Sequence, residues 1–219
     1  MRLWEVLMSN IEHEPTGNYK RVIDDWEVRA QAWDYKERYE ALKLAGYTED
    51  NRLPITFYGQ KYWINRQDGT IREAWGEESK TGFGTAIAIY SLFFHSIKNP
   101  RQTGVWVPFR EVKRAAPFTA AYQRTILDLF ASSFDGKTDQ LIAAVDKLGF
   151  ERIEDSDVGF QAKVFSCIPL KFMFWDGDDE FPAQANILFD AEITDYIHEE
   201  TVVMIASEGV NRLISTILQ

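Results

Sequence analysis

Apolar side chains recur at helical spacing through the first part of the chain. A short series precedes Pro15, and a longer one steps by four and three residues: Tyr19, Ile23, Trp26, Ala30 and Trp33. This spacing predicts an amphipathic helix with aromatic side chains on its buried face. Because the apolar stripe then changes phase, we expect a break near Asp34. Residues 1–45 are therefore predicted to form a helical N-terminal part.

The pattern changes to strands at Leu53. Residues 53–76 contain three short runs rich in β-branched and aromatic residues, with Gly59 after the first run and Asp68-Gly69 before the last. An Asp-Gly pair is a strong hairpin signal, because glycine adopts a positive φ without strain. We predict a three-stranded antiparallel meander here.

The segment Gly84–Ile97 is apolar nearly all round, which is typical of a helix buried on every side. The pattern predicts further elements along the rest of the chain: helices from Thr119 and Thr138, strands at 161–168, 170–175 and 186–189, and a long helix from about Glu199. Strands and helices do not alternate strictly, so an α+β fold is favoured over a doubly wound nucleotide-binding fold.

No linker or composition shift divides the chain. We therefore predict that residues 1–219 form a single α+β domain with a mainly antiparallel sheet, a buried central helix and a long C-terminal helix. We also expect the two groups of strands to share one sheet.

Charge and composition narrow the classes of partner. The chain carries a formal net charge of −10, whereas phosphate backbones and anionic membranes bind clustered Lys and Arg. We therefore expect no nucleic-acid and no membrane partner. Cys167 is the only cysteine, so one chain cannot form a disulfide or a multi-cysteine metal site. With no signal-peptide pattern and no membrane-length apolar run, we expect a cytoplasmic location.

Carboxylates crowd the stretch WDGDDEFPAQANILFD, residues 175–190, between two strand-like runs. Carboxylate oxygens are ligands for divalent cations, so one interpretation is a metal site built from Asp176, Asp178, Glu180 and Asp190. The other interpretations are a hydrated turn and an ion pair with a nearby base. We expect the turn to stay largely hydrated, and Asp190 to accept backbone N–H groups as a helix N-cap.

The densest basic cluster lies at residues 110–114, directly after the apolar run VWVPF. It is interpreted either as a solvated or ion-paired loop or as a contact for an anionic ligand. If a ligand binds, we expect Arg110, Glu111, Asp178 and Glu180 to contact it.

Three segments together resemble a bacterial domain family of unknown function, common in anaerobes: DDEFPA…ILFD, GVWVPFRE and KYWI with the buried helix after it. The resemblance covers residues 35–219 and implies that Asp178, Glu180, Pro182 and Asp190 matter together. Some members carry an added cysteine-rich iron–sulfur segment, which this chain lacks. The segment KRAAPF also departs from the glycine-rich turn expected after Arg110.

Three functions remain open from the sequence. The first is an accessory or small-ligand-binding module without catalysis of its own, because no catalytic constellation is recognisable. The second is a metal-assisted hydrolase or transferase using Asp178, Glu180 and Asp190, and the third is a protein–protein interaction module. No cofactor is identified, although a divalent cation would suit the acidic cluster. The partner is expected to be a small molecule or a protein, and a homodimer could cover an exposed sheet edge.

Overall fold

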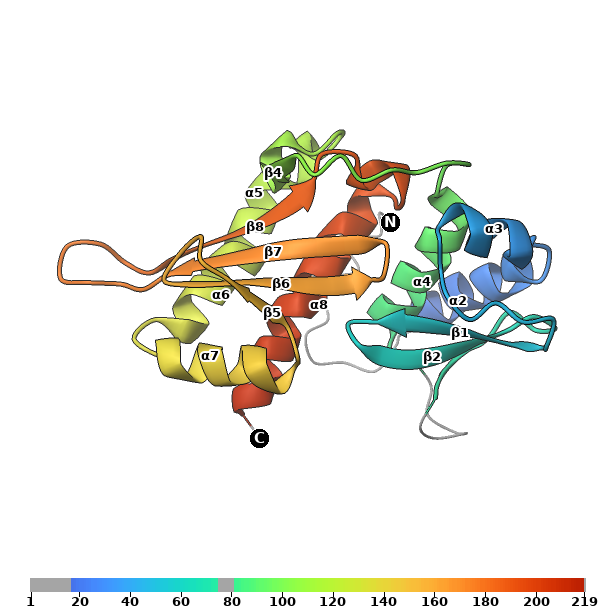
Figure 1. The fold of residues 1–219 in the computed structure, drawn as a ribbon, viewed down its shortest axis with the longest axis horizontal. Coiled ribbons are helices and arrows are strands. Elements are labelled where there is room, and N and C mark those ends of the chain that lie inside the picture. The colour runs from blue at the N-terminus through green and yellow to red at the C-terminus, as the bar shows by residue number, and fades with distance from the viewer. Residues whose placement is uncertain (1–16, 75–80, 219) are drawn as a thin grey trace.

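Two antiparallel sheets and the helices packed on them make up the α+β fold of the computed structural model, which describes residues 17–74 and 81–218 (Figure 1). The helix expected before Pro15 lies outside these residues. The α+β class, the buried central helix and the long C-terminal helix are confirmed. The expectation of one shared sheet is wrong, because the two groups of strands form separate sheets.

The N-terminal helices break where the apolar stripe changes phase. Helix α2 spans Gly17–Ala30, and α3 spans Tyr35–Ala41. Asp34 is the N-cap of α3, and its Oδ1 accepts a hydrogen bond from the backbone N–H of Glu37 at 3.0 Å. A side chain that satisfies a free N–H in this way favours a new helix start over continuation of the previous helix.

The first sheet is the predicted meander. Its strands are β1 (Arg52–Phe57), β2 (Gln60–Asn65) and β3 (Ile71–Glu73), paired in that order. Gly69 has φ +76°, and a Cβ built there would lie 2.1 Å from the carbonyl oxygen of Glu27 in α2. The turn therefore needs glycine both for its backbone conformation and for its close approach to the helix.

Helix α4, Phe83–His95, is the buried central helix. Every residue from 85 to 93 is buried, as expected from a sequence that is apolar nearly all round. The hydroxyl of Tyr90 donates to the carbonyl oxygen of Gly69 at 2.8 Å, which ties α4 to the meander turn.

The second sheet has the strand order β4-β8-β7-β6-β5 in the described part of the chain. The strands are β4 (Trp106–Pro108), β5 (Glu151–Ile153), β6 (Val158–Phe165), β7 (Ile168–Trp175) and β8 (Gln184–Asp190). Its two outer strands, β4 and β5, are much shorter than the strands they flank. Ile187 and Phe189 are fully buried whereas Leu188 is only partly buried, so β8 buries one face as the alternation predicts.

Helices between β4 and β5 cover this sheet on one side. They are α5 (Thr119–Tyr122), a π-helical segment (Gln123–Leu127), α6 (Asp128–Phe134) and α7 (Thr138–Lys147). Short 3-10 turns lie at Phe109–Glu111, Ala116–Phe118 and Ile193–Asp195. The helix predicted from Thr119 is interrupted by the π-helical segment, and its apolar stripe, Tyr122, Ile126, Phe130 and Phe134, is buried.

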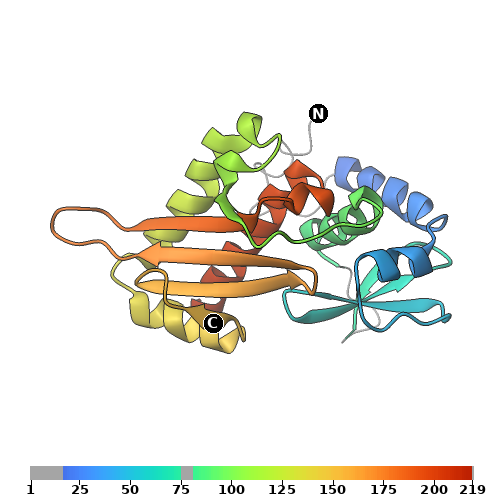
Figure 2. The same ribbon diagram turned by 45° about the horizontal axis from the view of Figure 1, so that its top comes forward.

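The long C-terminal helix α8, Glu199–Ile217, packs against α4 on the side of the first sheet and against α7 and β6 on the side of the second sheet (Figure 2). At Gly209 a Cβ would meet the ring of Phe172 at 2.6 Å and the hydroxyl of Tyr58 at 2.7 Å. Glycine thus lets α8 approach one side chain from each sheet. One backbone hydrogen bond joins the sheets directly, from the N–H of Tyr58 to the carbonyl oxygen of Val164 at 2.8 Å. Among the described helices, none is both long and apolar enough to cross a membrane.

Candidate functional site

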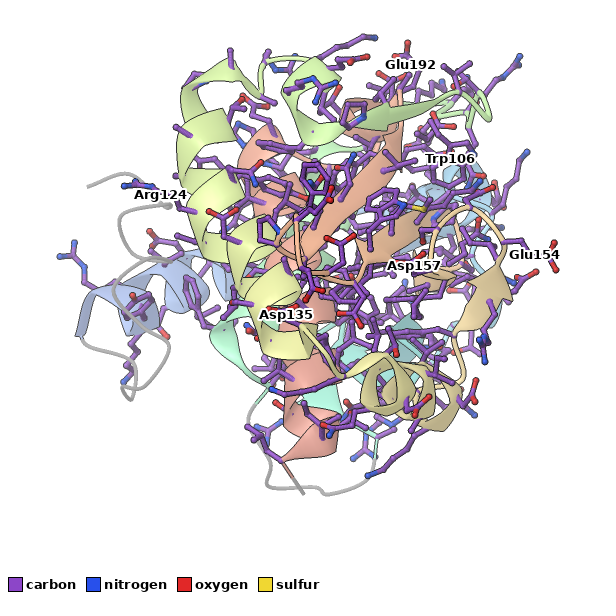
Figure 3. The ribbon with its side chains drawn as sticks, turned by 90° about the vertical axis from the view of Figure 1, so that its left-hand side faces the viewer. Trp106, Arg124, Asp135, Glu154, Asp157 and Glu192 are labelled. Carbon is purple, nitrogen blue, oxygen red and sulfur yellow. The ribbon has the colours of Figure 1, made fainter. Side chains whose placement is uncertain are left out.

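The acidic stretch forms the turn of the β7–β8 hairpin, which projects from one end of the molecule (Figure 1). Asp176 fixes the base of this hairpin. Its Oδ1 accepts a hydrogen bond from the N–H of Gly136 at 2.7 Å, and its own N–H donates to Oδ2 of Asp157 at 2.9 Å. Figure 3 views the molecule from this end and labels Asp135 and Asp157. The first acid of the cluster therefore has a structural role.

Asp178 shapes the turn itself. Its Oδ1 accepts from the backbone N–H groups of Glu180 at 2.8 Å and Phe181 at 2.7 Å. These two hydrogen bonds hold the pKa of Asp178 below its usual value, because they stabilise the ionised form. Asp178, Asp179 and Glu180 are all exposed to solvent. The expectation of a hydrated turn agrees with this exposure.

The carboxylates proposed for a metal site do not converge. Asp190 ends β8, whereas Asp178 and Glu180 lie beyond its other end. Gln184 and Asp190 are the two ends of β8, six residue steps apart, which corresponds to about 20 Å at the usual rise per residue. Among residues 17–74 and 81–218, no three His, Cys, Asp or Glu side chains are arranged to hold a metal ion.

Asp190 connects the end of β8 to the loop before β4 through hydrogen bonds, and only 5 % of its surface is exposed. Its Oδ2 accepts from the N–H groups of Thr103 and Gly104, both at 2.8 Å. Its Oδ1 accepts from the N–H of Glu192 at 3.0 Å and from the hydroxyl of Thr103 at 3.1 Å. Asp190 thus accepts backbone N–H groups, as expected, but it is not a helix N-cap: it ends a strand, and three of its four hydrogen bonds come from Thr103 and Gly104 in a distant loop.

Arg110 and Glu111 lie in the 3-10 turn that follows β4. Their side chains are largely exposed, and Nη2 of Arg110 is 3.5 Å from Oε1 of Glu111. Arg110 lines a pocket of about 420 Å³ at the base of the acidic hairpin. The other lining residues come from the π-helical segment, α6 and the β7–β8 hairpin: Gln123, Leu127, Asp128, Ala131, Trp175, Ala183, Gln184, Ala185 and Asn186. We call this the Arg110 pocket.

The walls of the Arg110 pocket differ in chemistry. Gln123 begins the π-helical segment and Asp128 directly follows it, and Nε2 of Gln123 donates to Oδ1 of Asp128 at 2.7 Å. Asn186 and the exposed Trp175 come from the β7–β8 hairpin. π-helical turns inside α-helices are rare and often occur at functional sites. The pocket can therefore offer a guanidinium, amide groups, one carboxylate and an aromatic surface to a bound molecule.

A second hollow, of about 400 Å³, lies where the β1–β2 turn meets β5 and β6. Tyr58 and Phe150 are among its lining residues. This hollow lies along the contact between the two sheets, where the N–H of Tyr58 donates to the carbonyl oxygen of Val164. We interpret it as a consequence of that contact.

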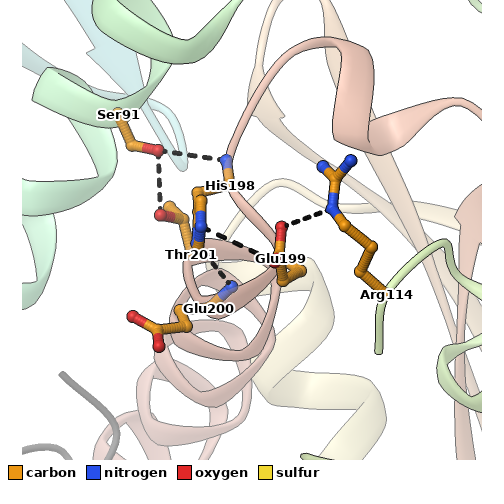
Figure 4. Close-up of polar contacts among 6 residues, drawn as sticks. All are labelled: Ser91, Arg114, His198, Glu199, Glu200 and Thr201. Atoms are coloured by element: carbon orange, nitrogen blue, oxygen red, sulfur yellow. Dashed lines mark hydrogen bonds and ion pairs between the residues drawn. The ribbon is translucent and has the colours of Figure 1, made fainter. Parts of the chain in front are cut away.

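A third polar cluster surrounds the start of α8 (Figure 4). Nδ1 of His198 accepts from the N–H of Glu200 at 3.3 Å, so His198 caps the helix. Oε2 of Glu199 accepts from Nε of Arg114 at 3.1 Å. Arg114 has φ 63°, a conformation that glycine adopts more easily, and it lies within the KRAAPF segment where a glycine-rich turn was expected.

Two histidines meet beside this cluster. The ring centroids of His95, at the end of α4, and His198 are 5.1 Å apart. Burial, and then the proximity of His198, lower the pKa of His95. Ser91 of α4 accepts from the hydroxyl of Thr201 at 2.8 Å and from the N–H of His198 at 3.3 Å. These contacts join α4 to α8 and account for the cluster as a helix junction.

The structure thus places Arg110 in a pocket and Glu111 beside it, leaves Asp178 and Glu180 on the exposed turn, and separates Asp190 from both. Sequence reasoning missed Gln123, Asp128, Trp175 and Asn186. Amide residues carry no motif, and the interruption of a helix by a π-turn leaves no periodic signal.

Comparison with known proteins gives one family. Neither a curated protein nor a solved structure matches the chain. A family model described as a domain of unknown function (DUF3786) matches residues 34–212, which include the Arg110 pocket, the acidic turn and Asp190. The chain belongs to this DUF3786 family.

Proposed function

We propose that this protein is a non-catalytic cytoplasmic accessory module that binds a polar ligand with an anionic group in the Arg110 pocket. The observation that carries this proposal is the convergence of Arg110, the Gln123–Asp128 pair and Trp175 on one hollow. Its volume of about 420 Å³ lies within the range of about 300–1,000 Å³ common for ligand sites.

Arg110 is suited to an anionic group. A guanidinium presents a planar fork of N–H donors that matches carboxylate and phosphate oxygens. Its present partner, Glu111, is exposed and 3.5 Å away. Exposed ion pairs of this kind contribute little free energy, typically about 0–1 kcal/mol. A ligand anion can therefore replace Glu111 at small cost.

The rest of the Arg110 pocket favours binding over catalysis. Among its lining residues in the described chain there is no His, Cys, Ser or Lys, and Asp128 is the one carboxylate. A nucleophile paired with a base is the usual mark of covalent catalysis, and general acid–base catalysis needs a positioned proton carrier. The amides of Gln123 and Asn186 instead suit hydrogen bonds to a neutral polar part of the ligand.

A thermal-shift screen followed by calorimetry tests the proposal, with mono- and dicarboxylates, amino acids and sugar phosphates as probes. A compound that binds the folded state raises the melting temperature, and the rise grows with the ratio of its free concentration to its Kd. We expect such a rise in the natural protein, its loss in Arg110→Gln, and its retention in Arg152→Gln. Arg152 is an exposed arginine on β5, at the other edge of the sheet, and serves as the matched control.

Two results would contradict the proposal. If a bound compound raises the melting temperature equally in Arg110→Gln, the Arg110 pocket is not the site. If the compound is converted to a product on mixing with the protein, the module is an enzyme.

A further inference from the structure

Strand β8 is longer than the strand that covers its outer side. Residues Leu188–Asp190 pair with β4, and β4 ends at Pro108 opposite Leu188. In the described part of the chain, no strand pairs with residues 184–187 on that side. These four residues form an open strand edge, and Gln184, Ala185 and Asn186 line the Arg110 pocket.

The backbone direction along this edge follows from one hydrogen bond. The N–H of Ala191 donates to the carbonyl oxygen of Val105 at 2.9 Å, so odd-numbered residues here direct their backbone groups toward the β4 side. Successive residues of a strand alternate in direction. Ala185 and Ile187 therefore direct their N–H and C=O groups to the open edge. Oδ1 of Asn186 accepts from the N–H of Ile187 at 2.9 Å. The N–H and C=O of Ala185 point to the open edge, and Ala185 is one of the residues that line the Arg110 pocket.

The opposite side of the sheet shows how such an edge is closed. Strand β5 pairs with β6 only at residues 159–161. Beyond β5, the N–H of Tyr58 donates to the carbonyl oxygen of Val164, so the first sheet occupies that part of β6. Exposed edges invite pairing with other chains, and proteins commonly block them. One long strand of this sheet is thus covered, and β8 is left open beside a pocket.

We infer that the ligand of the Arg110 pocket is an extended segment of another protein, which adds to the open edge of β8 as an antiparallel strand. This inference rests on the proposed function and names its ligand class. A polypeptide backbone supplies the alternating donor and acceptor that Ala185 presents, and strand addition is a common mode of peptide recognition. The open edge of four residues spans about 13 Å.

Charge defines the segment further. An antiparallel partner continues in the direction of β4, so its first residues lie near Arg110 and its last residues approach the acidic turn. Arg110 then favours an acidic side chain at the beginning of the segment. The exposed carboxylates of Asp178, Asp179 and Glu180 favour a basic side chain at its end.

Fluorescence anisotropy with a labelled heptapeptide tests the inference. The probe has aspartate at its second position, lysine at its sixth, and alternating valine and threonine between them. We expect saturable binding, and weaker binding of a second peptide in which the aspartate and lysine are exchanged. Binding should also weaken in Arg110→Gln.

Ala185→Pro tests the backbone contact directly. It removes the N–H that faces the open edge and leaves the hydrogen bonds to β7 in place, and proline is tolerated on edge strands. The matched variant Ala185→Val keeps the N–H. We expect affinity to fall roughly three- to tenfold in Ala185→Pro relative to Ala185→Val, as for the loss of one hydrogen bond. If Ala185→Pro does not fold, N-methylation of the probe at the amides that face β8, compared with methylation of the alternate amides, makes the same test.

Several outcomes would overturn the inference. One is equal affinity of the probe for Ala185→Pro and Ala185→Val, or equal affinity of the two methylated probes. Another is a peptide that does not bind while a small carboxylate still binds through Arg110, which refutes strand addition and keeps the proposed function. If neither binds, both fail. A homodimer that sedimentation detects and that Ala185→Pro dissociates would place a second copy, not another protein, on this edge.

Discussion

Replacing Asp190 by alanine is the sharpest test of how this fold holds its second sheet together. The carboxylate accepts four hydrogen bonds, from the backbones of Thr103, Gly104 and Glu192 and from the hydroxyl of Thr103. It is 95 % buried, since its exposed fraction is 5 %. Asp190→Ala leaves these donors without their acceptor.

The expected loss can be estimated from the bonds. A hydrogen bond to a charged group stabilises by about 1.5–3 kcal/mol, but such values are not additive, and the cavity left by the carboxylate admits water. We therefore expect Asp190→Ala to lower the free energy of unfolding by about 3 kcal/mol. A helix N-cap alone would contribute about 0.5–2 kcal/mol. The strand-to-loop role of Asp190 therefore predicts a larger effect than a cap role would.

Urea denaturation measures this change in the free energy of unfolding. An unchanged slope of free energy against urea concentration shows that unfolding remains two-state. Hydrogen exchange should also show faster exchange of the Thr103 and Gly104 amides. Asp179→Ala is the matched control, because Asp179 is an exposed acid of the turn and its removal should change stability by less than about 0.5 kcal/mol. A loss of under about 1 kcal/mol in Asp190→Ala, with both amides still protected, would refute the reasoning.

Three further measurements test other parts of the structure. Gly69→Ala should lower the free energy of unfolding in urea titrations by at least about 2 kcal/mol, because φ is +76° and the added Cβ would lie 2.1 Å from the carbonyl oxygen of Glu27. A decrease of less than about 1 kcal/mol would contradict the packing of α2 on the turn. The pKa of His95 is lowered from 6.5 in the folded protein, so below about pH 6.5 the unfolded chain binds more protons and the free energy of unfolding should fall as the pH drops. This fall should be less steep in His95→Gln, and equal slopes of the free energy of unfolding against pH in the two proteins would reject the reasoning. Burial raises the pKa of Cys167 to about 12, so Ellman's reagent at pH 8 should modify it far more slowly in folded than in unfolded protein.

Local patterns predicted the elements well because their causes are local. Asp68-Gly69 predicted the turn that joins β2 to β3, and the continuous apolar run predicted a helix buried on all sides. The break at Asp34 follows from one side chain and the N–H three residues later. Each of these signals lies within a few residues of the feature it specifies.

Long-range pairing was not accessible in the same way. The strand groups were expected to share a sheet, since both have suitable composition, but no local pattern says which strand pairs with which. The donors to Asp190 show the same limit: Thr103 lies 87 residues away in the chain. An acid before a helix-like segment predicts a cap. The loop that actually binds it can be identified only once the chain has folded.

The open edge of β8 arises from a local event with a distant consequence. Pro108 ends β4 and a 3-10 turn carries the chain away from the sheet, so β8, some 80 residues later, loses its neighbour at residues 184–187. The same turn brings Arg110 to the pocket beside that edge. A strand edge left open by chance would have no particular arrangement of charged side chains beside it. Here the segment that uncovers the strand also supplies the cation next to it, and the hairpin that continues from the strand supplies the acids beyond. One short turn thus leaves the strand edge unpaired and also places beside it the positive charge that would select a partner strand. Ala185→Pro tests the unpaired edge, and Arg110→Gln tests the charge.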